Sequence, residues 1–402
     1  MSGLRVVLIS RKYWPLVSDD ASFAADLSQG LLQAGNQVMV LTALWHASWP
    51  PQITDRGVRV LRMPQSRGSV WGSHRYVRSL TSWLRKNSSR FDAVLVLGMR
   101  EEAEAAMAAT AGMRQPVVLV PSAAGLDGDC YWQLESPSGD RIKRACMEAA
   151  ALIAGDVTQE AELIAAGFIR ERIHRITPGL SEMPAATTWN RDQTRAALLD
   201  CNRAFYIPNR APLVVHNGPL IEGRGLQTLL AAWPRVLVKY PMATLWIAGN
   251  GPLRGLLMQM CDRLRLHQRV LLPGTFDQPA DLLTTADIYV TPSPPQGPCR
   301  NLMRAMAVGL PIVAATATGT TEHPLIEHAR TGLLTPSGNV EALADALLHL
   351  LDDPLTAQRL GEAARQQAAS CFDLSQCVRR YQELLERLCS PDSLPQPHPV
   401  SL

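Results

Sequence analysis

The sequence predicts an α/β protein with two doubly wound domains that face a central cleft. Apolar strand-like runs alternate with helical patterns nearly throughout the chain, which is typical of parallel sheets covered by helices. A polar, Pro-containing stretch at 181–212 interrupts this rhythm, and 402 residues are enough for two domains with separate cores. The predicted parts are a first domain at 1–182, a connection at 183–211, a second domain at 212–372, a C-terminal helix at 373–390 that crosses back to the first domain, and a disordered tail at 391–402.

The strands expected in the first domain are short apolar runs bounded by turn residues. In chain order they are Arg5–Ser10, Gln37–Thr42, Val58–Arg62, Ala93–Leu97 and Pro116–Pro121, with shorter strands near Leu152–Ala154 and Ile173–Ile176. Helical patterns occupy the intervals, as crossovers between parallel strands require. These helices are expected at Asp19–Ala34, His74–Lys86, Glu101–Ala111, Arg141–Ala150 and Gln159–Ala166, with one more at Arg191–Leu199 in the connection.

The second domain repeats the alternation, without visible sequence similarity to the first. Its strands are expected at Leu213–Asn217, Ala243–Ala248, Val270–Pro273, Asp287–Thr291 and Leu310–Ala314. Its helices are expected at Leu226–Lys239, Leu253–Arg265, Cys299–Val308, Val340–Leu351, Pro354–Ser370 and Leu374–Leu388.

Composition excludes several classes of protein. Apolar residues make up 47% and charged residues 19% of the chain, a balance that disordered proteins lack. A net charge of +3 gives no support for a nucleic-acid partner. No run reaches the roughly 18 apolar residues that span a bilayer, and the N-terminus reads as a core strand instead of a signal peptide. The eight scattered cysteines predict reduced thiols in a cytoplasmic protein, with no zinc site.

The stretch from Ser293 to Ala314 is the most informative motif. It follows an apolar strand, opens with a Pro/Gly turn, continues as a short helix that stops at Gly309, and leads into another apolar strand. This order leaves the first backbone N–H groups of the helix, at Cys299–Asn301, directed at whatever lies above the sheet edge. The motif therefore predicts a phosphate site.

The sequence of this stretch resembles the donor-sugar signature of family 4 glycosyltransferases, which have the GT-B fold of two Rossmann-like domains. Further segments are similar to family segments in the same order: Trp246–Leu253 with its Gly-Asn-Gly-Pro, Val270–Gly274, Leu282–Ser293, Thr331–Pro336 and Glu341–Leu347. The first half is similar more faintly, at Arg5–Ser10, Trp14-Pro15, Leu32–Val40 and Phe168–Gly179.

The chain departs from the family pattern at positions where the family has charged or phosphate-binding residues. The two signature glutamates are replaced by Gln296 and Arg304. Of the Arg and Lys that grip the donor diphosphate in the family, Pro219 replaces the first and Arg224 stands for the second. Ser18 and Asp19 occupy the place of a Gly pair, and the usual histidine of the fourth strand falls on Leu95 or Leu97.

The resemblance implies transfer of a sugar from a nucleotide diphosphate sugar to an acceptor hydroxyl, with retention, in glycan or polysaccharide synthesis. It implies no bound metal and no cofactor besides the donor substrate. Arg224, Arg304 and the helix-start amides would hold the diphosphate, and Gln296 would orient the sugar. The remaining residues of this nucleotide-sugar site are expected to be Gly218, Gly249, Asn250, Gly251, Pro252, Gly297, Cys299, Arg300, Asn301 and Glu322. For Arg304 the competing interpretation is a solvated helix residue, and for Glu322 with His323 an ordinary polar loop.

A Gly/Asp loop after the fifth strand supplies Asp127 and Asp129 as candidates for the acceptor-side base. A turn held by Asx hydrogen bonds explains the same residues equally well.

Two other functions remain open at this point. The chain can be a catalytically degenerate homologue that acts as a sugar-nucleotide binding or partner subunit, or another GT-B enzyme such as a nucleotide-sugar epimerase. The acceptor is expected to be a carbohydrate or lipid-linked. Arginines at 74–90 beside an apolar stripe predict either a peripheral contact with the inner membrane face or a solvated surface helix.

Overall fold

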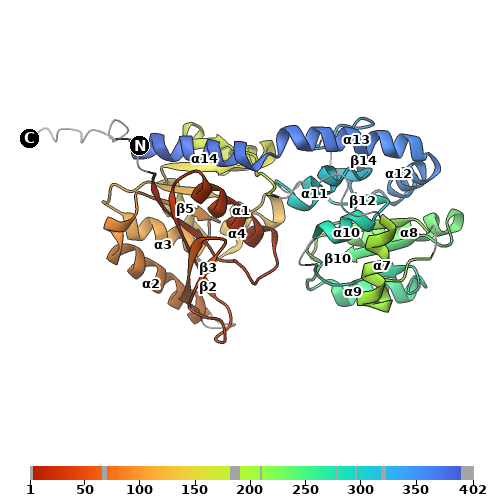
Figure 1. Cartoon of the computed structure of the whole chain (residues 1–402), viewed down its shortest axis with the longest axis horizontal. Coiled ribbons are helices and arrows are strands. Elements are labelled where there is room, and N and C mark those ends of the chain that lie inside the picture. Colours follow the sequence, from red (N-terminus) through yellow and green to blue (C-terminus); the bar gives the residue numbers. More distant parts are fainter. Residues whose placement is uncertain are drawn as a thin grey trace, which may run out of the picture. The chain divides into compact units, whose positions relative to one another are not determined.

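The computed structural model describes residues 3–65, 70–181, 191–208, 211–276, 279–294, 297–317 and 323–390. Residues 183–190 and 209–210 of the expected connection, and the expected tail at 391–402, lie outside these residues. The chain divides into two compact units, and each contains its own sheet. The first unit combines Met1–Gly179 and Gln296–Pro298 with the chain from Leu374 onward, and the second comprises Leu180–Pro295 and Cys299–Asp373 (Figure 1).

The first unit contains an eight-stranded sheet in the order β3-β4-β2-β1-β5-β6-β7-β8. All neighbouring pairs are parallel except β3 with β4. The strands are β1 (Arg5–Ser10), β2 (Gln37–Leu44), β3 (Gln52–Asp55), β4 (Val58–Pro64), β5 (Ala93–Leu97), β6 (Val117–Val120), β7 (Ala151–Ala154) and β8 (Ile173–Arg175). The carboxyl ends of the parallel strands therefore meet at one edge of the sheet.

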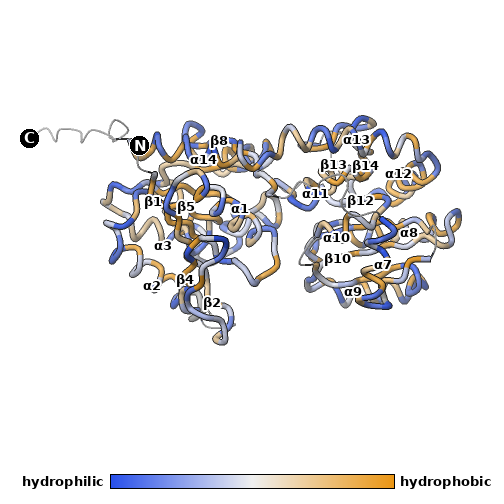
Figure 2. Tube along the Cα trace, in the orientation of Figure 1, coloured by the Kyte–Doolittle hydropathy of each residue, from blue (hydrophilic) through white to orange (hydrophobic). Residues whose placement is uncertain are grey.

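Helices cover both faces of this sheet, so that apolar strand residues are buried on both sides. Figure 2 shows how hydrophobic and hydrophilic residues alternate along the trace. The helices are α1 (Asp19–Gln33), α2 (Val70–Lys86), α3 (Glu101–Thr110), α4 (Asp129–Glu135), α5 (Gly139–Met147), α6 (Val157–Ala165) and α14 (Leu374–Cys389). Helix α14 packs against α1, with the rings of Phe23 and Tyr381 6.5 Å apart. The expected return of the C-terminal helix to the first domain is confirmed.

The second unit contains a six-stranded, fully parallel sheet in the order β11-β10-β9-β12-β13-β14. Its strands are β9 (Leu213–Asn217), β10 (Thr244–Ala248), β11 (Val270–Leu271), β12 (Ile288–Thr291), β13 (Ile312–Thr316) and β14 (Leu333–Pro336). Its helices are α7 (Arg191–Cys201), α8 (Leu226–Lys239), α9 (Arg254–Arg263), α10 (Pro279–Thr285), α11 (Arg300–Val308), α12 (Val340–Asp352) and α13 (Pro354–Cys371). Two buried clusters, one on each face, form its core.

The expected α/β architecture with two doubly wound domains is confirmed, but four elements were not expected. Strand β3 is an antiparallel edge strand without an apolar run, and β14 has only four residues. Helices α4 and α10 have seven residues each, too short for a clear helical period. The last expected strand of the signature begins at Ile312 instead of Leu310. None of the described helices is long and apolar enough to cross a membrane.

Candidate nucleotide-sugar site

Two loops of the second unit meet at the carboxyl edge of its sheet. The loop after β9 donates from the Gly218 amide to the Ala248 carbonyl (3.0 Å) and from the Leu220 amide to the Asn250 carbonyl (3.0 Å). The structure thus brings Gly218 together with Gly249, Asn250 and Gly251, as expected for one binding site.

Glycine is required at this meeting point because the two backbones touch. Gly249 has φ of 141°, and a Cβ there would lie 1.8 Å from the carbonyl oxygen of Gly218. A Cβ on Gly251 would lie 2.3 Å from the Leu220 carbonyl oxygen. The exposed Asn250 closes the turn by accepting a hydrogen bond from the Gly251 amide (2.9 Å). The exposed Pro252 follows directly, ahead of α9. Gly249 and Gly251 are therefore needed, before any ligand is considered, to let the two loops touch.

Helix α11 begins at Arg300, with Cys299 as its N-cap. The Cys299 side chain forms no capping hydrogen bond, and the first turn carries no acidic residue. The amides at the start of the helix therefore present the positive end of the helix dipole without a carboxylate in the same turn. Arg300 itself is buried, with 4% of its surface exposed.

Arg304 is tied to the sheet through two asparagines. The Asn301 Oδ1 atom accepts from Arg304 Nη1 (3.1 Å) and from Asn217 Nδ2 (3.2 Å). Asn301 is buried, whereas Arg304 is half-buried. The guanidinium is therefore held at a defined place beside the end of β9, which a freely solvated helix residue would not be.

His216 is a polar residue in this region that the sequence reasoning missed. It lies in β9, is 4% exposed, and its Nδ1 is 2.9 Å from the Val290 carbonyl oxygen. Burial, with a smaller contribution from Arg224, lowers the pKa of His216 to about 4. The ring is therefore neutral at pH 7, and Nδ1 carries the proton that it donates to Val290. Its Nε2 lone pair has no hydrogen-bond partner among the described residues. The sequence feature that could have drawn attention to His216 is a histidine inside the apolar run 213–217.

The other residues expected at the nucleotide-sugar site are described one by one. Gln296 and Glu322 lie outside the described residues. Gly297 is buried with φ of 86°, and Arg224 is half-buried just before Gly225, the N-cap of α8. His323 accepts from the Leu325 and Ile326 amides at Nδ1 (3.1 and 3.2 Å), and burial lowers its pKa to about 4. His323 therefore stabilises a turn.

In the first unit, the expected Gly/Asp loop is a 3-10 turn (Gly125–Asp127) followed by α4. Asp129 is fully buried and accepts from the Met99 amide (2.9 Å), the Ser122 amide (3.0 Å), the Ser122 hydroxyl (3.0 Å) and Arg100 Nε (2.8 Å). These contacts occupy both carboxylate oxygens. They make Asp129 a residue that joins the ends of β5 and β6, and they leave it poorly placed to accept a proton from a substrate. Asp127 remains the candidate base; its carbonyl accepts from Arg100 Nη2 (3.3 Å).

Ion pairs join the loop after β1 to the first turn of α3. Arg11 Nη1 lies 2.8 Å from Glu101 and 4.0 Å from the buried Glu102. Burial raises the pKa of Glu102 to about 7, although Arg11 opposes the shift. The Ser18 hydroxyl oxygen accepts from the Ala21 amide (3.1 Å) as the N-cap of α1. A helix cap thus explains a serine where the family has glycine.

Among the described residues, no group of three or more His, Cys, Asp or Glu side chains is arranged to hold a metal ion.

Two family models match the chain. The model described as "Glycosyl transferase 4-like domain" covers residues 21–179, and that described as "Glycosyl transferases group 1" covers residues 211–353. N-acetyl-alpha-D-glucosaminyl L-malate synthase of Bacillus anthracis is 26% identical over 49% of this chain and 49% of that protein. The chain thus spans about half the length of the first curated relatives that it matches.

Solved structures share the fold over nearly the whole chain. Sucrose-phosphate synthase from Thermosynechococcus elongatus has a TM-score of 0.79 at 19% identity, covering 96% of this chain and 99% of its own. Anabaena HepE in complex with UDP and glucose has a TM-score of 0.76 at 19% identity, covering 95% and 99%. Together, the two matching family models cover more than half of the sequence, and the folds agree. The chain belongs to the family 4 glycosyltransferases of the GT-B fold.

Proposed function

We propose that this protein transfers a sugar from a nucleotide diphosphate sugar to an acceptor hydroxyl, in glycan or polysaccharide synthesis. The observation that carries the proposal is the carboxyl edge of the second sheet. There the Gly218 and Gly249 loops touch, and α11 begins without a carboxylate in its first turn. Parallel α/β sheets bind nucleotides at this edge, and a helix start favours phosphate.

The donor diphosphate is assigned to the helix-start amides of α11 together with Arg224 and Arg304. Asn301 holds Arg304 in place, and each guanidinium can donate two hydrogen bonds to phosphate oxygens. These cations offset the charge that develops on the leaving diphosphate. They take over from the family arginine that Pro219 replaces. The proposal also includes transfer with retention of the anomeric configuration, and sugar contacts by Gln296 and Glu322. These two parts are based on the family resemblance.

The acceptor is proposed to be a carbohydrate or lipid-linked hydroxyl bound by the first unit, with Asp127 as the candidate base. A sugar-nucleotide donor fits the similar HepE structure, which is in complex with UDP and glucose. The proposal includes a peripheral contact of residues 74–90 with a membrane surface, because five basic side chains and no acidic ones occur there.

One alternative is supported by particular residues. Arg304 stands where the family has a glutamate that accepts hydrogen bonds from the ribose, and a guanidinium has no acceptor. A catalytically degenerate homologue that binds sugar nucleotides, or that acts as a partner subunit, fits this substitution.

The transferase and the degenerate homologue are distinguished by whether the protein turns over nucleotide sugars. We expect the wild type to hydrolyse at least one member of a panel of nucleotide sugars slowly and to transfer the sugar faster when an acceptor is present. The restoring double variant Gln296→Glu/Arg304→Glu should then lose activity, because it removes a phosphate ligand. An Arg263→Gln variant, changed at an exposed site in α9, is the control and should keep full activity. Tight nucleotide binding without turnover, with activity gained by the double variant, would support the degenerate homologue instead.

A further inference from the structure

A pocket of the first unit lies between its edge strand β8 and the C-terminal helix α14 (Figure 2). Residues 174–176, at the end of β8, form one wall, and residues 380, 383, 384 and 387 of α14 form the other. These helix positions are three or four apart, so they share one face of α14. The volume is about 280 Å³, which suits a small ligand.

The pocket has an apolar floor and a charged rim. Ile176 and Leu384 are each 4% exposed and belong to the core of the first unit. Arg380 and Arg387 are exposed, and neither has an ion-pair partner among the described residues. They lie two turns apart on α14, about 10 Å along its axis, a gap that two long side chains can close from either side. The rim therefore offers two available guanidiniums above an apolar surface.

The strand wall adds a third cation and a neutral ring. Arg175 is exposed and lies 3.3 Å from a carboxylate oxygen of Glu160. Burial lowers the pKa of the His174 ring, and the nearby charge of Arg387 lowers it further, so the ring is mainly neutral at pH 7. Three arginines against Glu383 give the lining a net charge of +2. A phosphate monoester carries a matching charge of about −1.5 to −2 at pH 7.

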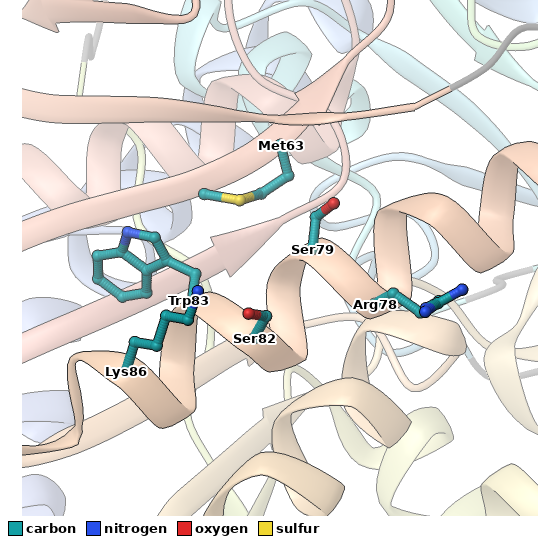
Figure 3. A pocket seen from close by; sticks show the side chains of 6 residues that line it. All are labelled: Met63, Arg78, Ser79, Ser82, Trp83 and Lys86. Atoms are coloured by element: carbon teal, nitrogen blue, oxygen red, sulfur yellow. The ribbon is translucent and has the colours of Figure 1, made fainter.

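The hollow beside α2 in the same unit lacks this arrangement. It has a volume of about 380 Å³, and its cations, Arg78 and Lys86, both come from the helix. Figure 3 shows these two side chains directed to opposite sides, while the strand contributes only Met63. A small anion in that hollow would meet one cation at most. Only the pocket at β8 has cations on both of its walls.

We propose that the pocket between β8 and α14 binds a phosphate dianion, free or as the monoester of a small metabolite, and thereby links the C-terminal helix to the edge of the first sheet. Arg380 and Arg387 donate from the helix and Arg175 from the strand, since guanidinium groups form paired hydrogen bonds with phosphate oxygens. The carbons of an ester lie over Ile176 and Leu384. The site does not depend on glycosyl transfer, because all of its residues belong to the first unit.

The test follows the ring signal of His174, which reports this pocket separately from the nucleotide-sugar site. The full-length protein carries isotope-labelled histidine, and His174→Gln identifies the signal among the nine histidines. We expect the signal to shift during NMR titrations with α-glycerol phosphate and with inorganic phosphate, and to stay unchanged with glycerol. Tighter binding of α-glycerol phosphate would assign the pocket to an ester, and equal binding would assign it to phosphate itself.

Four variants test the lining. Arg380→Gln and Arg387→Gln should each weaken binding about 10-fold, the size expected for a hydrogen bond between charged groups. Arg379→Gln is the matched control, because it removes an exposed arginine beside Arg380 that does not line the pocket, and it should keep nearly full affinity. Glu383→Gln should tighten binding several-fold, since it removes the negative charge of the lining. A damaged fold would not produce this gain.

Equal weakening by Arg379→Gln and Arg380→Gln would show a general attraction to a basic helix and would overturn the site. An unmoved His174 signal with both phosphate probes would do the same. The unfolding midpoint of the first unit should rise with α-glycerol phosphate, because the ligand binds the folded state. A midpoint that does not rise would contradict the link between α14 and the sheet. Titration with UDP is run in parallel, so that failure of the proposed function is seen separately.

Discussion

Two buried titratable residues, Glu102 and His216, respond to pH in opposite ways. Folding raises the pKa of Glu102 from 4.5 to about 7, mainly through burial. Folding lowers the pKa of His216 from 6.5 to about 4 for the same reason. Glu102 therefore destabilises the first unit as pH rises from 4.5 to 7, since only the unfolded chain loses its proton there. His216 destabilises the second unit as pH falls from 6.5 to 4, since only the unfolded chain binds a proton.

Glu102→Gln should thus become more stabilising, relative to wild type, as pH rises. Between pH 4.5 and 8 the difference in unfolding free energy between variant and wild type should grow by up to about 3 kcal/mol. This value follows because a difference of one pKa unit corresponds to about 1.4 kcal/mol. Denaturant unfolding at a series of pH values measures it. Glu148→Gln, at an exposed position after α5, is the control and should leave the pH profile unchanged. A constant difference across this range would show that Glu102 is not buried as described.

Arg224→Gln should weaken the binding of nucleoside diphosphates about 10- to 100-fold, because a charged hydrogen bond to phosphate contributes about 1.5–3 kcal/mol. Calorimetric titration with UDP, ADP and GDP gives the dissociation constants. Arg263→Gln, changed at an exposed site in α9, should bind as the wild type does. An unchanged affinity in Arg224→Gln would remove this residue from the site.

Residue types in the sequence were enough to propose the donor site but not the contacts of each side chain. The glycines at 218, 249 and 251 were placed together correctly, because they follow neighbouring strands. Asp129 was expected in a Gly/Asp loop as a candidate acceptor-side base, yet four donor atoms from the ends of β5 and β6 surround its carboxylate. Such contacts join residues far apart in the chain, and no local pattern indicates them.

At the scale of elements, the loops of the second unit depend on glycine where backbones touch. Gly249→Ala should displace the Gly218 loop, since the new Cβ would lie 1.8 Å from its carbonyl oxygen. We expect a loss of several kcal/mol in unfolding free energy and of nucleotide binding, from the clash and the positive φ together. Gly255→Ala in α9 is the matched control, because nothing lies within 4 Å of its Cβ position.

The control should be stabilised by up to about 1 kcal/mol, since alanine favours a helix over glycine. Thermal unfolding and nucleotide titration measure both variants. Nucleotide binding of Gly249→Ala equal to that of wild type would show that the two loops do not have to touch.

Elements with a strong period were predicted well, and those without one were missed. β1, β5, β9 and α8 have the bounds that the apolar runs indicated. Strand β3 lies at the edge of the sheet, half exposed and paired antiparallel with β4, so its residues need no apolar run. Helix α4 begins in a Gly/Asp stretch that by itself favours a turn.

At the scale of the whole molecule, two sheets with separate cores predict two unfolding transitions. Tyr381→Ala removes a fully buried ring from the face of the first unit that α14 covers. It should destabilise that unit by about 3–5 kcal/mol, as large-to-small core changes do. Leu350→Ala in α12, which is 2% exposed in the core of the second unit, should lower the other transition. Calorimetry resolves the two, and a single transition shifted by both variants would contradict independent cores.

The alternation of strands and helices was sufficient to predict two doubly wound domains. The connection was predicted at the polar stretch 183–211, because a break in a hydrophobic pattern is local information; helix α7 within that stretch belongs to the second unit. The sequence did not indicate that α14 packs against α1. This contact places Val378 beside Gly30, which is far from it in the chain, and no local pattern reports such a contact.

The return of α14 to the first unit sets an order of events during synthesis. Apart from Gln296–Pro298, the second unit is one continuous stretch of the chain, so its sheet can form as soon as that stretch has left the ribosome. The first unit, although translated earlier, lacks Val378, Tyr381 and Leu385 of its core until the last helix is made. The part of α1 that α14 covers, around Phe23 and Gly30, stays exposed to water or bound to a chaperone while the second unit is translated. The part that is made first is therefore the last to become complete.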